Sequence, residues 1–378
     1  MLIKEIDKKA FCNIVKFRKI DRPKVISLFS GCGGLDLGFH YEGYKIIWAN
    51  DNNKYATQSF ENYFGKDIIH CDDIAKINPY DKKAVPDCQL ILGGFPCQDF
   101  SIIWKRPGLN GERGNIYKEY LRFVDAKKPL AFIAENVKGL ITIHNYKAIE
   151  QIINDFENII PGYLIFPKLY NFADYGVPQF RERVILVGIR MDTCFDFKHP
   201  KPTHGPKADK PYLTSGEALK GAENAIYNNE HMHISKTTIE RLMKIPKGGN
   251  FSCIAKDDPH YVKGMISHVY RRIDPDKPAM TVIAAGGGGT HGYYFPEPRA
   301  LTFRERARLQ SFPDNFKFEG GPAEVRRQIG NAVPPQGVRS LAKALMNLFT
   351  KNYRPIDLKK KSEELKMIPI KERIEVDV

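Results

Sequence analysis

The chain has 378 residues, a length sufficient for one large globular domain or two smaller ones. Its composition, 42% hydrophobic and 27% charged residues, is typical of globular proteins. No stretch approaches about 18 uncharged apolar residues and the first residues lack the apolar core of a signal peptide, so we expect a cytoplasmic protein without a membrane span. The formal net charge of +14 favours a polyanionic partner, although charge alone does not separate DNA, RNA, a membrane surface or an ordinary basic surface.

Short apolar runs alternate with helical patterns through the first half of the chain, after a charged and weakly patterned extension at residues 1–22. We expect strands at 24–29, 45–49, 67–70, 89–92, 129–134 and 183–189, and helices at 35–41, 55–64, 116–126 and 146–159. This alternation predicts βαβ units and a parallel sheet, and therefore an α/β fold.

The alternation ends near residue 191. Loop-forming residues and a four-glycine run at 286–289 predict a smaller, irregular second domain over 191–322. Helical periodicity returns after residue 323, so we assign 323–350 to the first domain together with 23–190. Residues 351–378 have the composition of a charged C-terminal tail.

Unusual residues follow five of the predicted strands. They are a glycine cluster after the first strand, Asp51 after the second, Asp73 after the third, Cys97 after the fourth and Glu135 after the fifth. Because the carboxyl ends of parallel strands meet at one edge of a sheet, we expect these residues to share a site.

The glycine cluster, Phe29–Leu35, stands between a strand and a helix, where backbone N–H groups can meet a ligand. It matches neither GxGxxG nor GxxxxGK[ST], which favours a nucleoside-containing cofactor without an obligatory pyrophosphate. Asp51 is placed to accept hydrogen bonds from ribose hydroxyls; a turn residue or helix cap is the alternative.

Cys97 follows Gly-Gly-Phe-Pro in a stiff turn, where its sulfur can face a cleft as a nucleophile rather than pack as a buried thiol. The next residues, 98–115, are rich in glycine and basic side chains and suit a lid that meets phosphates. Seven cysteines without a CxxC pair do not support a metal site.

Three further polar positions are candidates. Glu135 can act as a general acid or orient a ring nitrogen, or be a solvated strand end. Arg181 and Arg183 fall on one face of an extended segment and can bind a base carbonyl or a phosphate, or pair with Glu182. Asn331 stands where the chain breaks before a helix, which is also an ordinary helix-start position.

Together these segments resemble the bacterial DNA cytosine-5 methyltransferases of restriction–modification systems, over residues 24–349. The resemblance is carried, in the family's order and spacing, by FSGCGGLDLG (29–38), GGFPCQDFS (93–101), AENV (134–137), QFRERV (179–184), RRIDPDKPAMTV (271–282) and GNAVPP (330–335). It implies a Rossmann-like S-adenosylmethionine-dependent methyltransferase fold with a mixed, mostly parallel sheet, and makes 191–322 a target-recognition domain.

The resemblance also implies a mechanism. Cys97 would add to C6 of a cytosine flipped out of the duplex, and the activated C5 would take the methyl group. Glu135 would hydrogen-bond N3 and the exocyclic amine. Arg183, supported by Arg181, would contact O2, and Asn136 belongs to the same catalytic group.

The family's binding positions carry over residue by residue. Those for S-adenosylmethionine are Phe29, Ser30, Gly31, Cys32, Gly33, Gly34, Leu35, Asp51, Asn52, Asp73, Ile74, Pro96 and Asn331. Those facing DNA are Gln98, Ser101, Lys105, Arg106 and Arg113. Two positions depart from the family: Asn52 replaces a bulky residue that packs on adenine, and Asp51 replaces the more common Glu.

We expect a monomer that binds double-stranded DNA and needs no metal. A cognate restriction endonuclease would act on the same DNA site without having to bind this chain. The alternatives are a tRNA cytosine-5 methyltransferase, whose Cys-Phe-Thr signature is missing, a catalytically silent DNA-binding protein, and a methyltransferase for small molecules or proteins. The DNA sequence recognised by 191–268 cannot be decoded from the residues.

Overall fold

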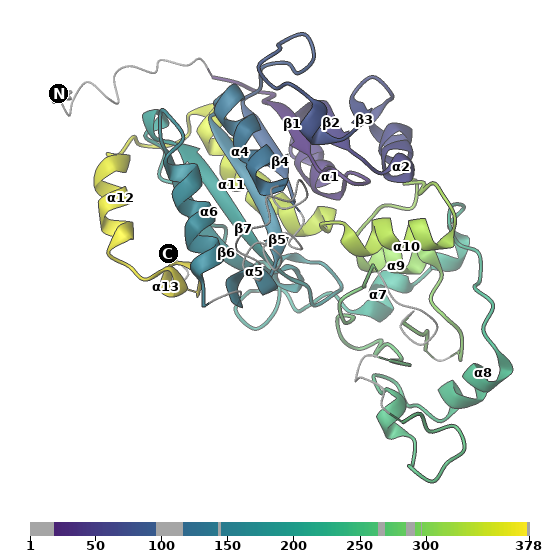
Figure 1. The fold of residues 1–378 in the computed structure, drawn as a ribbon. Coiled ribbons are helices and arrows are strands. Elements are labelled where there is room, and N and C mark those ends of the chain that lie inside the picture. The colour runs from purple at the N-terminus through teal and green to yellow at the C-terminus, as the bar shows by residue number, and fades with distance from the viewer. Residues whose placement is uncertain are drawn as a thin grey trace, which may run out of the picture.

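A seven-stranded sheet organises the larger part of the molecule, in the order β3-β2-β1-β4-β5-β7-β6 (Figure 1). The computed structural model describes residues 19–95, 116–142, 145–263, 269–284, 292–295 and 297–375. The strands are β1 Lys24–Leu28, β2 Lys45–Asp51, β3 Ile69–Cys71, β4 Leu90–Gly93, β5 Ala131–Val137, β6 Tyr163–Asn171 and β7 Glu182–Arg190. The first five strands run parallel, whereas β7 is antiparallel to both β5 and β6.

Helices cover both faces of the sheet, which is why its central strands are nearly continuous apolar runs. On one face α1 and α11 pack on side chains such as Val25 and Leu92. On the other, α4 and α6 bring Phe123 and Phe156 against Phe132. The helices of this part are α1 Gly34–Tyr41, α2 Lys54–Phe64, α4 Ile116–Lys127, α5 Gly139–Thr142, α6 Lys147–Glu157 and α11 Pro335–Thr350, with short 3₁₀ turns η1 Ile74–Lys76, η2 Phe172–Tyr175 and η3 Met191–Thr193.

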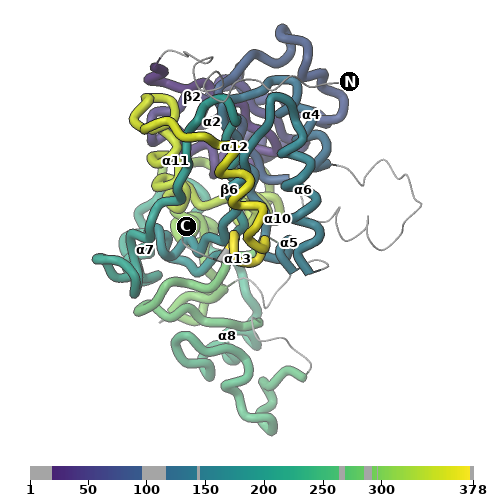
Figure 2. The backbone as a smooth tube through the Cα atoms, turned by 90° about the vertical axis from the view of Figure 1, so that its left-hand side faces the viewer, coloured from purple at the N-terminus to yellow at the C-terminus, as the bar shows by residue number. Residues whose placement is uncertain are grey.

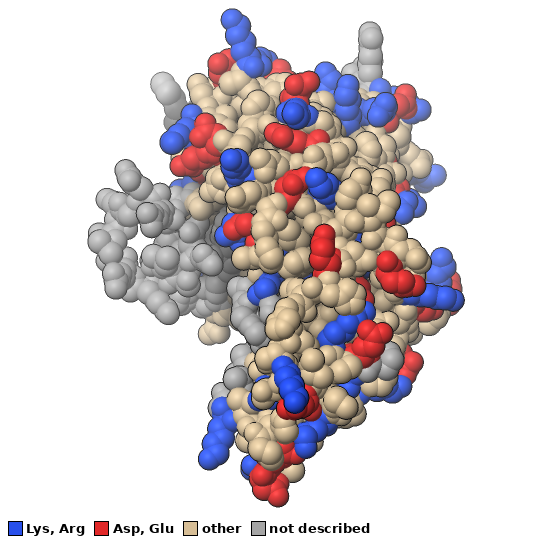
Figure 3. Space-filling model, turned by 90° about the vertical axis from the view of Figure 1, so that its right-hand side faces the viewer, with Lys and Arg blue, Asp and Glu red and all other residues tan. Residues whose placement is uncertain are grey.

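A smaller lobe projects from one end of the sheet domain (Figure 1). It contains α7 Ser215–Leu219, η4 Ala222–Asn224, α8 Lys236–Met243, η5 Phe251–Cys253 and α9 Phe303–Leu309, while α10 Pro322–Asn331 joins it to the sheet domain. Its apolar clusters are small, and buried arginines bridge its loops. Arg304, for example, donates to the carbonyls of Tyr227, Pro313 and Phe316. Lys and Arg are interspersed with Asp and Glu over the face in Figure 3 rather than gathered in one patch.

The C-terminal segment is folded against the sheet domain. Helix α13 Ile370–Glu375 packs against β6, and α12 Leu358–Lys366 precedes it on the same side of the sheet domain (Figure 2). Leu358, Leu365 and Ile374 are buried there, and the Arg373 guanidinium donates to the Ile165 carbonyl at 3.0 Å. The composition of a charged tail does not predict this packing.

The expected α/β class with a mostly parallel sheet is confirmed, and the expected strands and helices of the first half lie within a few residues of those observed. One strand, β6, is missing from the sequence prediction. It contains Pro167, which cannot donate to a ladder, and such residues are tolerated at a sheet edge, where β6 lies. Among the described residues no helix is long and apolar enough to cross a membrane.

Candidate functional site

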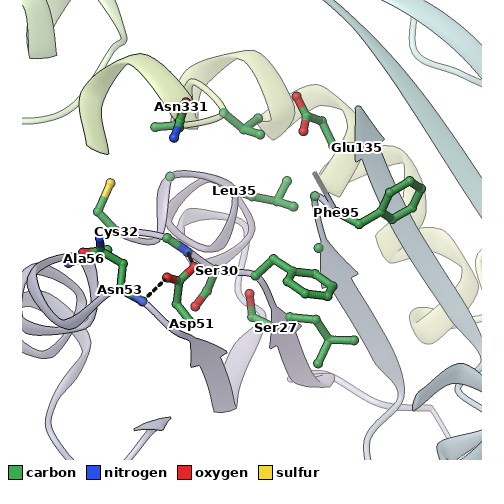
Figure 4. Close-up of a pocket in the computed structure, with 18 of the residues that line it drawn as sticks. Ser27, Ser30, Cys32, Leu35, Asp51, Asn53, Ala56, Phe95, Glu135 and Asn331 are labelled. Carbon is green, nitrogen blue, oxygen red and sulfur yellow. Dashed lines mark hydrogen bonds between the residues drawn. The ribbon is translucent and has the colours of Figure 1, made fainter. Parts of the chain in front are cut away.

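A cavity of about 750 Å³ opens at the carboxyl ends of β1, β2, β4 and β5 (Figure 4). Its size falls in the usual range for a small-molecule site. The residues predicted from the sequence that line it are Phe29, Ser30, Gly31, Cys32, Gly34, Leu35, Asp51, Asn52, Asp73, Ile74, Glu135, Asn136, Arg183 and Asn331. The predicted residues Pro96, Cys97, Gln98, Ser101, Lys105, Arg106 and Arg113 lie outside the described part of the chain.

The glycine turn after β1 forms one wall of this cavity. Gly31 and Gly33 have φ angles of 54° and 90°, in the left-handed region that favours glycine. A Cβ on Gly34 would stand 2.3 Å from the Val333 carbonyl oxygen. Glycine at this position therefore lets α1 begin directly against the segment that joins α10 to α11.

Asp51 ties the end of β2 to this turn. One carboxylate oxygen accepts the Gly31 N–H at 2.8 Å and the other accepts the Asn53 N–H at 2.8 Å. Burial raises the pKa of Asp51, while these backbone hydrogen bonds and the Arg327 charge oppose the rise. Each oxygen keeps a second lone pair, so the carboxylate can still accept hydrogen bonds from a bound diol.

Helix α10 supplies a wall that the sequence prediction found only in part. Asn331, predicted at a break before a helix, is the last residue of α10 and lies across the cavity from Asp51 (Figure 4). Arg327 and Gln328 line the same cavity. Residues three and four apart share a face of a helix, so Asn331 together with helical periodicity contained the signal for both.

The base of α2 is held to α10 by side chains. Asn53 caps α2 by accepting the Ala56 N–H at 2.9 Å, and its amide donates to Glu324 at 3.3 Å. Ser59 Oγ donates to Gln328 Oε1 at 2.6 Å. Helix α10 is therefore fixed against α2, beside the end of β2, by contacts between residues far apart in the sequence.

Glu135 and Arg183 form an ion pair at the other end of the cavity, with 3.1 Å between Glu135 Oε1 and Arg183 Nε. They meet because β7 runs antiparallel to β5, so its first residues lie beside the last residues of β5. A Cβ on Gly94 would stand 2.7 Å from Glu135 Oε2, so glycine there leaves room for the carboxylate. Burial raises the pKa of Glu135, and the Arg183 and Arg181 charges oppose the rise.

The side chains of Arg181 and Asn136 donate hydrogen bonds to backbone carbonyls around the cavity. Arg181 is 1% exposed, does not line the cavity, and donates to the carbonyls of Val282, Gly330 and Ala332 at 3.2, 2.8 and 2.9 Å. Burial lowers its pKa to about 9. The Asn136 amide donates to the Phe95 carbonyl at 2.9 Å, which fixes the chain just before Pro96.

The residues of the cavity fit a nucleoside-containing cofactor. The half-buried carboxylate of Asp51, with free lone pairs, stands at the end of β2. Two buried polar residues, Ser27 and Asp36, line the cavity without a partner in ordinary hydrogen-bond geometry among the described residues. Unpartnered buried polar atoms mark places where a ligand or water is expected. Among all the residues that the structure describes, no cluster of three or more His, Cys, Asp or Glu side chains that could hold a metal is found.

The fold is that of the Rossmann-like methyltransferases. It is similar to a protein encoded within an E. coli prophage whose structure carries the description "putative DNA modification methyltransferase", with a TM-score of 0.67, 25% identity and coverage of 86% of this chain and 99% of that one. The profile of the family described as C-5 cytosine-specific DNA methylase matches residues 23–347. The chain belongs to this family.

Two relatives narrow the class. The chain is 59% identical over 357 residues to the Type II methyltransferase M.NgoFVII of Neisseria gonorrhoeae, with 94% of each chain covered. It is 39% identical over 363 residues to the Type II methyltransferase M.BbvI of Brevibacillus brevis, with 90% of this chain and 94% of that one covered. The sequence prediction of a DNA cytosine-5 methyltransferase of restriction–modification type is confirmed, and the tRNA-acting and catalytically silent alternatives are not favoured.

Proposed function

We propose that this methyltransferase moves a methyl group from S-adenosylmethionine to C5 of a cytosine flipped out of double-stranded DNA, through a transient bond between Cys97 Sγ and C6. The observation that carries the proposal is one continuous cavity with Asp51 at one end and the Glu135–Arg183 pair at the other. The first end suits the cofactor and the second suits a polar heterocycle.

The cofactor end is built from Asp51, the glycine turn, Asp73 with Ile74, and Asn331. Asp51 would accept the ribose hydroxyls with its remaining lone pairs, and the backbone of the turn would approach the cofactor closely. S-adenosylmethionine, when bound, supplies an electrophilic methyl group.

At the other end, the raised pKa of Glu135 increases its protonated fraction, and the neutral carboxyl can donate a hydrogen bond to cytosine N3. Its second oxygen accepts from the exocyclic amine. Arg183, held against Glu135, would donate to O2. These contacts draw electrons from the ring, so the Cys97 thiolate can add to C6.

The bonding changes balance without a further reactant. The S–C6 bond would form as the electron pair of the C5–C6 double bond becomes available at C5. C5 would then take the methyl group as the S–CH3 bond of the donor breaks, and that bond's electron pair would stay on sulfur to leave the neutral thioether, S-adenosylhomocysteine. Loss of the C5 proton to a base and expulsion of the Cys97 thiolate restore the aromatic ring. In this mechanism Arg181 and Asn136 are positioning residues, because their side chains hold backbone carbonyls around the reacting groups.

The DNA side of the proposal rests on the sequence. We assign target recognition to 191–322 and DNA contacts to Gln98, Ser101, Lys105, Arg106 and Arg113, with residues 23–190 and 323–350 forming the catalytic domain. The enzyme would act as a monomer and protect sites that a partner restriction endonuclease cleaves.

Tritium transfer from methyl-labelled S-adenosylmethionine to duplex DNA tests the reaction, with tRNA as the competing substrate. We expect label in DNA alone, and none with Cys97→Ala. The matched control is Cys253→Ala, which removes an exposed thiol in the small lobe and should label DNA normally. Label in tRNA, or normal labelling by Cys97→Ala, would contradict the proposal.

A second experiment detects the covalent step directly. DNA carrying 5-fluorocytosine cannot release the adduct because the C5 substituent is not lost as a proton. We expect a complex that survives a denaturing gel with the wild-type chain and with Cys253→Ala, but not with Cys97→Ala. A wild-type chain that methylates DNA but leaves no adduct would disprove the covalent mechanism.

A further inference from the structure

Two buried polar side chains lie beneath the glycine turn without a partner. Asp36 is the third residue of α1 and is 0% exposed, and Ser27 lies on β1 and is 1% exposed. Neither carboxylate oxygen of Asp36, nor Ser27 Oγ, has a partner in ordinary hydrogen-bond geometry in the part of the chain that the structure describes, although the Ser27 hydroxyl lies near enough to act on the Asp36 carboxyl. Burying a carboxylate without a partner is unfavourable by several kcal/mol, so the arrangement requires an explanation beyond packing.

Both side chains line the cofactor cavity, at a position defined by the order of the strands. Strand β1 lies between β2, which ends in Asp51, and β4, which leads to Cys97. A cofactor with its ribose at Asp51 and its methyl group directed at a base near Glu135 must cross the end of β1. The portion of S-adenosylmethionine between ribose and methyl group is the sulfonium, so the positive charge passes over Ser27 and Asp36.

We propose that Asp36 is the counter-charge of this sulfonium and makes the site prefer the cationic methyl donor over the neutral product, S-adenosylhomocysteine. This inference rests on the proposed use of S-adenosylmethionine in the cavity. Asp36 acts through space in a region of low dielectric, where a charge pair is stronger than in water. Transfer of the methyl group removes the positive charge from sulfur, which weakens the attraction and favours release of the product.

The titration behaviour of Asp36 agrees with this role. Burial raises its pKa to about 7, and the Ser27 hydroxyl acts in the opposite direction. Without the cofactor the carboxyl is therefore largely neutral below pH 7 and about half ionised near it, which makes its burial tolerable. Arrival of a cation favours the carboxylate, so cofactor binding should release a proton.

Calorimetric titration with S-adenosylmethionine and S-adenosylhomocysteine tests the preference directly. Asp36→Asn keeps the shape of the side chain and removes its charge. We expect the dissociation constant of S-adenosylhomocysteine, divided by that of S-adenosylmethionine, to fall about tenfold, which is the effect of one charge-assisted contact. Asp87→Asn, which changes an exposed carboxylate outside the cavity, should leave the ratio unchanged. An equal loss of affinity for both ligands, or no loss, would overturn the inference.

A second measurement needs only the wild-type chain. Titrations at pH 7 in buffers of different ionisation enthalpy give the number of protons released on binding. We expect more protons with S-adenosylmethionine than with S-adenosylhomocysteine, and equal numbers would refute the role of Asp36. The other titratable or charged side chains that line the cavity are Cys32, Asp51, Asp72, Asp73, Glu135, Arg183 and Arg327.

Comparing the two ligands, which differ only in the methyl group and its charge, removes the part of their proton release that does not depend on this charge, and Asp36→Asn isolates the part that belongs to Asp36. Where Asp36→Asn is folded, it should abolish the difference in protons released. A wild-type chain that binds neither ligand would instead disprove the proposed function, so the two failures are distinguishable.

Discussion

The sheet domain and the small lobe each bury an ionisable side chain, Asp36 and Arg304, but surround it in opposite ways. In the sheet domain Asp36 is buried without a hydrogen-bond partner among the described residues, and the Glu135–Arg183 pair faces a cavity. In the lobe Arg304 is buried with three of its nitrogens donating to backbone carbonyls. A buried charge that is satisfied holds the protein together, whereas one that is left unsatisfied beside a cavity is reserved for a ligand.

The largest expected effect concerns the cavity side of this comparison. Glu135→Gln keeps the size of the side chain but cannot deliver a proton towards N3, so we expect methyl transfer to fall about 10²- to 10⁴-fold, the usual range for a general acid. Affinity for S-adenosylmethionine should be nearly unchanged, since Glu135 lies at the far end of the cavity from Asp51. Steady-state kinetics measure the rate of methyl transfer and calorimetry measures the affinity for the cofactor. A Glu135→Gln variant with a normal rate would show that Glu135 is not the general acid.

The next prediction concerns the pH dependence of stability. Burial raises the pKa of Asp36 from its ordinary value of 3.8 to about 7 in the folded chain, so the folded state binds more protons between these values. Its contribution to the free energy of unfolding is present below about pH 4 and lost as the pH rises through 7, by at most about 4 kcal/mol.

Denaturant unfolding of the ligand-free chain from pH 4 to pH 8 gives the measurement. Other groups titrate in the same range, so the informative quantity is the difference between wild type and Asp36→Asn. We expect the variant to gain stability relative to wild type as the pH rises, while losing affinity for the cofactor. A difference that does not change with pH would show that Asp36 is ionised, or solvated, throughout.

A smaller effect is expected at Arg181, where a substitution should reduce stability more than methyl transfer. Arg181→Met removes a donor from the carbonyls of Val282, Gly330 and Ala332, and we expect a loss of roughly 3 kcal/mol in the free energy of unfolding. Arg183→Met, whose partner Glu135 lines the cavity, should lower methyl transfer at a smaller cost in stability. Thermal unfolding and methyl-transfer assays on both variants test the contrast, which the reverse pattern would contradict.

The smallest effect is expected in the lobe. Arg304→Met removes the donor to Tyr227, Pro313 and Phe316, and we expect a loss of roughly 2 kcal/mol that is confined to this region. Limited proteolysis should cut the lobe sooner, while affinity for S-adenosylmethionine stays that of the wild type. Lys317→Met, an exposed change in the same lobe, is the control. Weakened cofactor binding in Arg304→Met would show that the two regions are coupled.

The sequence predicts the sheet domain better than the lobe for a physical reason. Its strands are buried on both faces and end in turns that need glycine, so the apolar runs and the residues at their ends, such as Asp51 and Glu135, stand out. The lobe is joined by contacts from arginine to carbonyl groups, and a backbone carbonyl carries no sequence signal. Arg304 is indistinguishable in the sequence from an exposed basic residue.

Other features escape for related reasons. In the sequence, Pro167 interrupts the apolar pattern of strand β6. Helices α12 and α13 bury only occasional apolar residues between charged ones. Asp36 reads as an ordinary acidic residue in the first turn of a helix, where such residues are common. Its distinction is the absence of exposure and of a partner, and only the packing of α1 against β1 reveals that.

The wall formed by α10 has a consequence for how the enzyme comes into being. Gly34 meets Val333, Asn53 meets Glu324 and Ser59 meets Gln328, which joins the beginning of the chain to a segment some 270 residues later. A ribosome must therefore have synthesised the chain through about residue 333 before the cofactor pocket can close. Fragments that end before α10 lack the Arg327, Gln328 and Asn331 wall of the cavity, so we expect them to bind the methyl donor weakly.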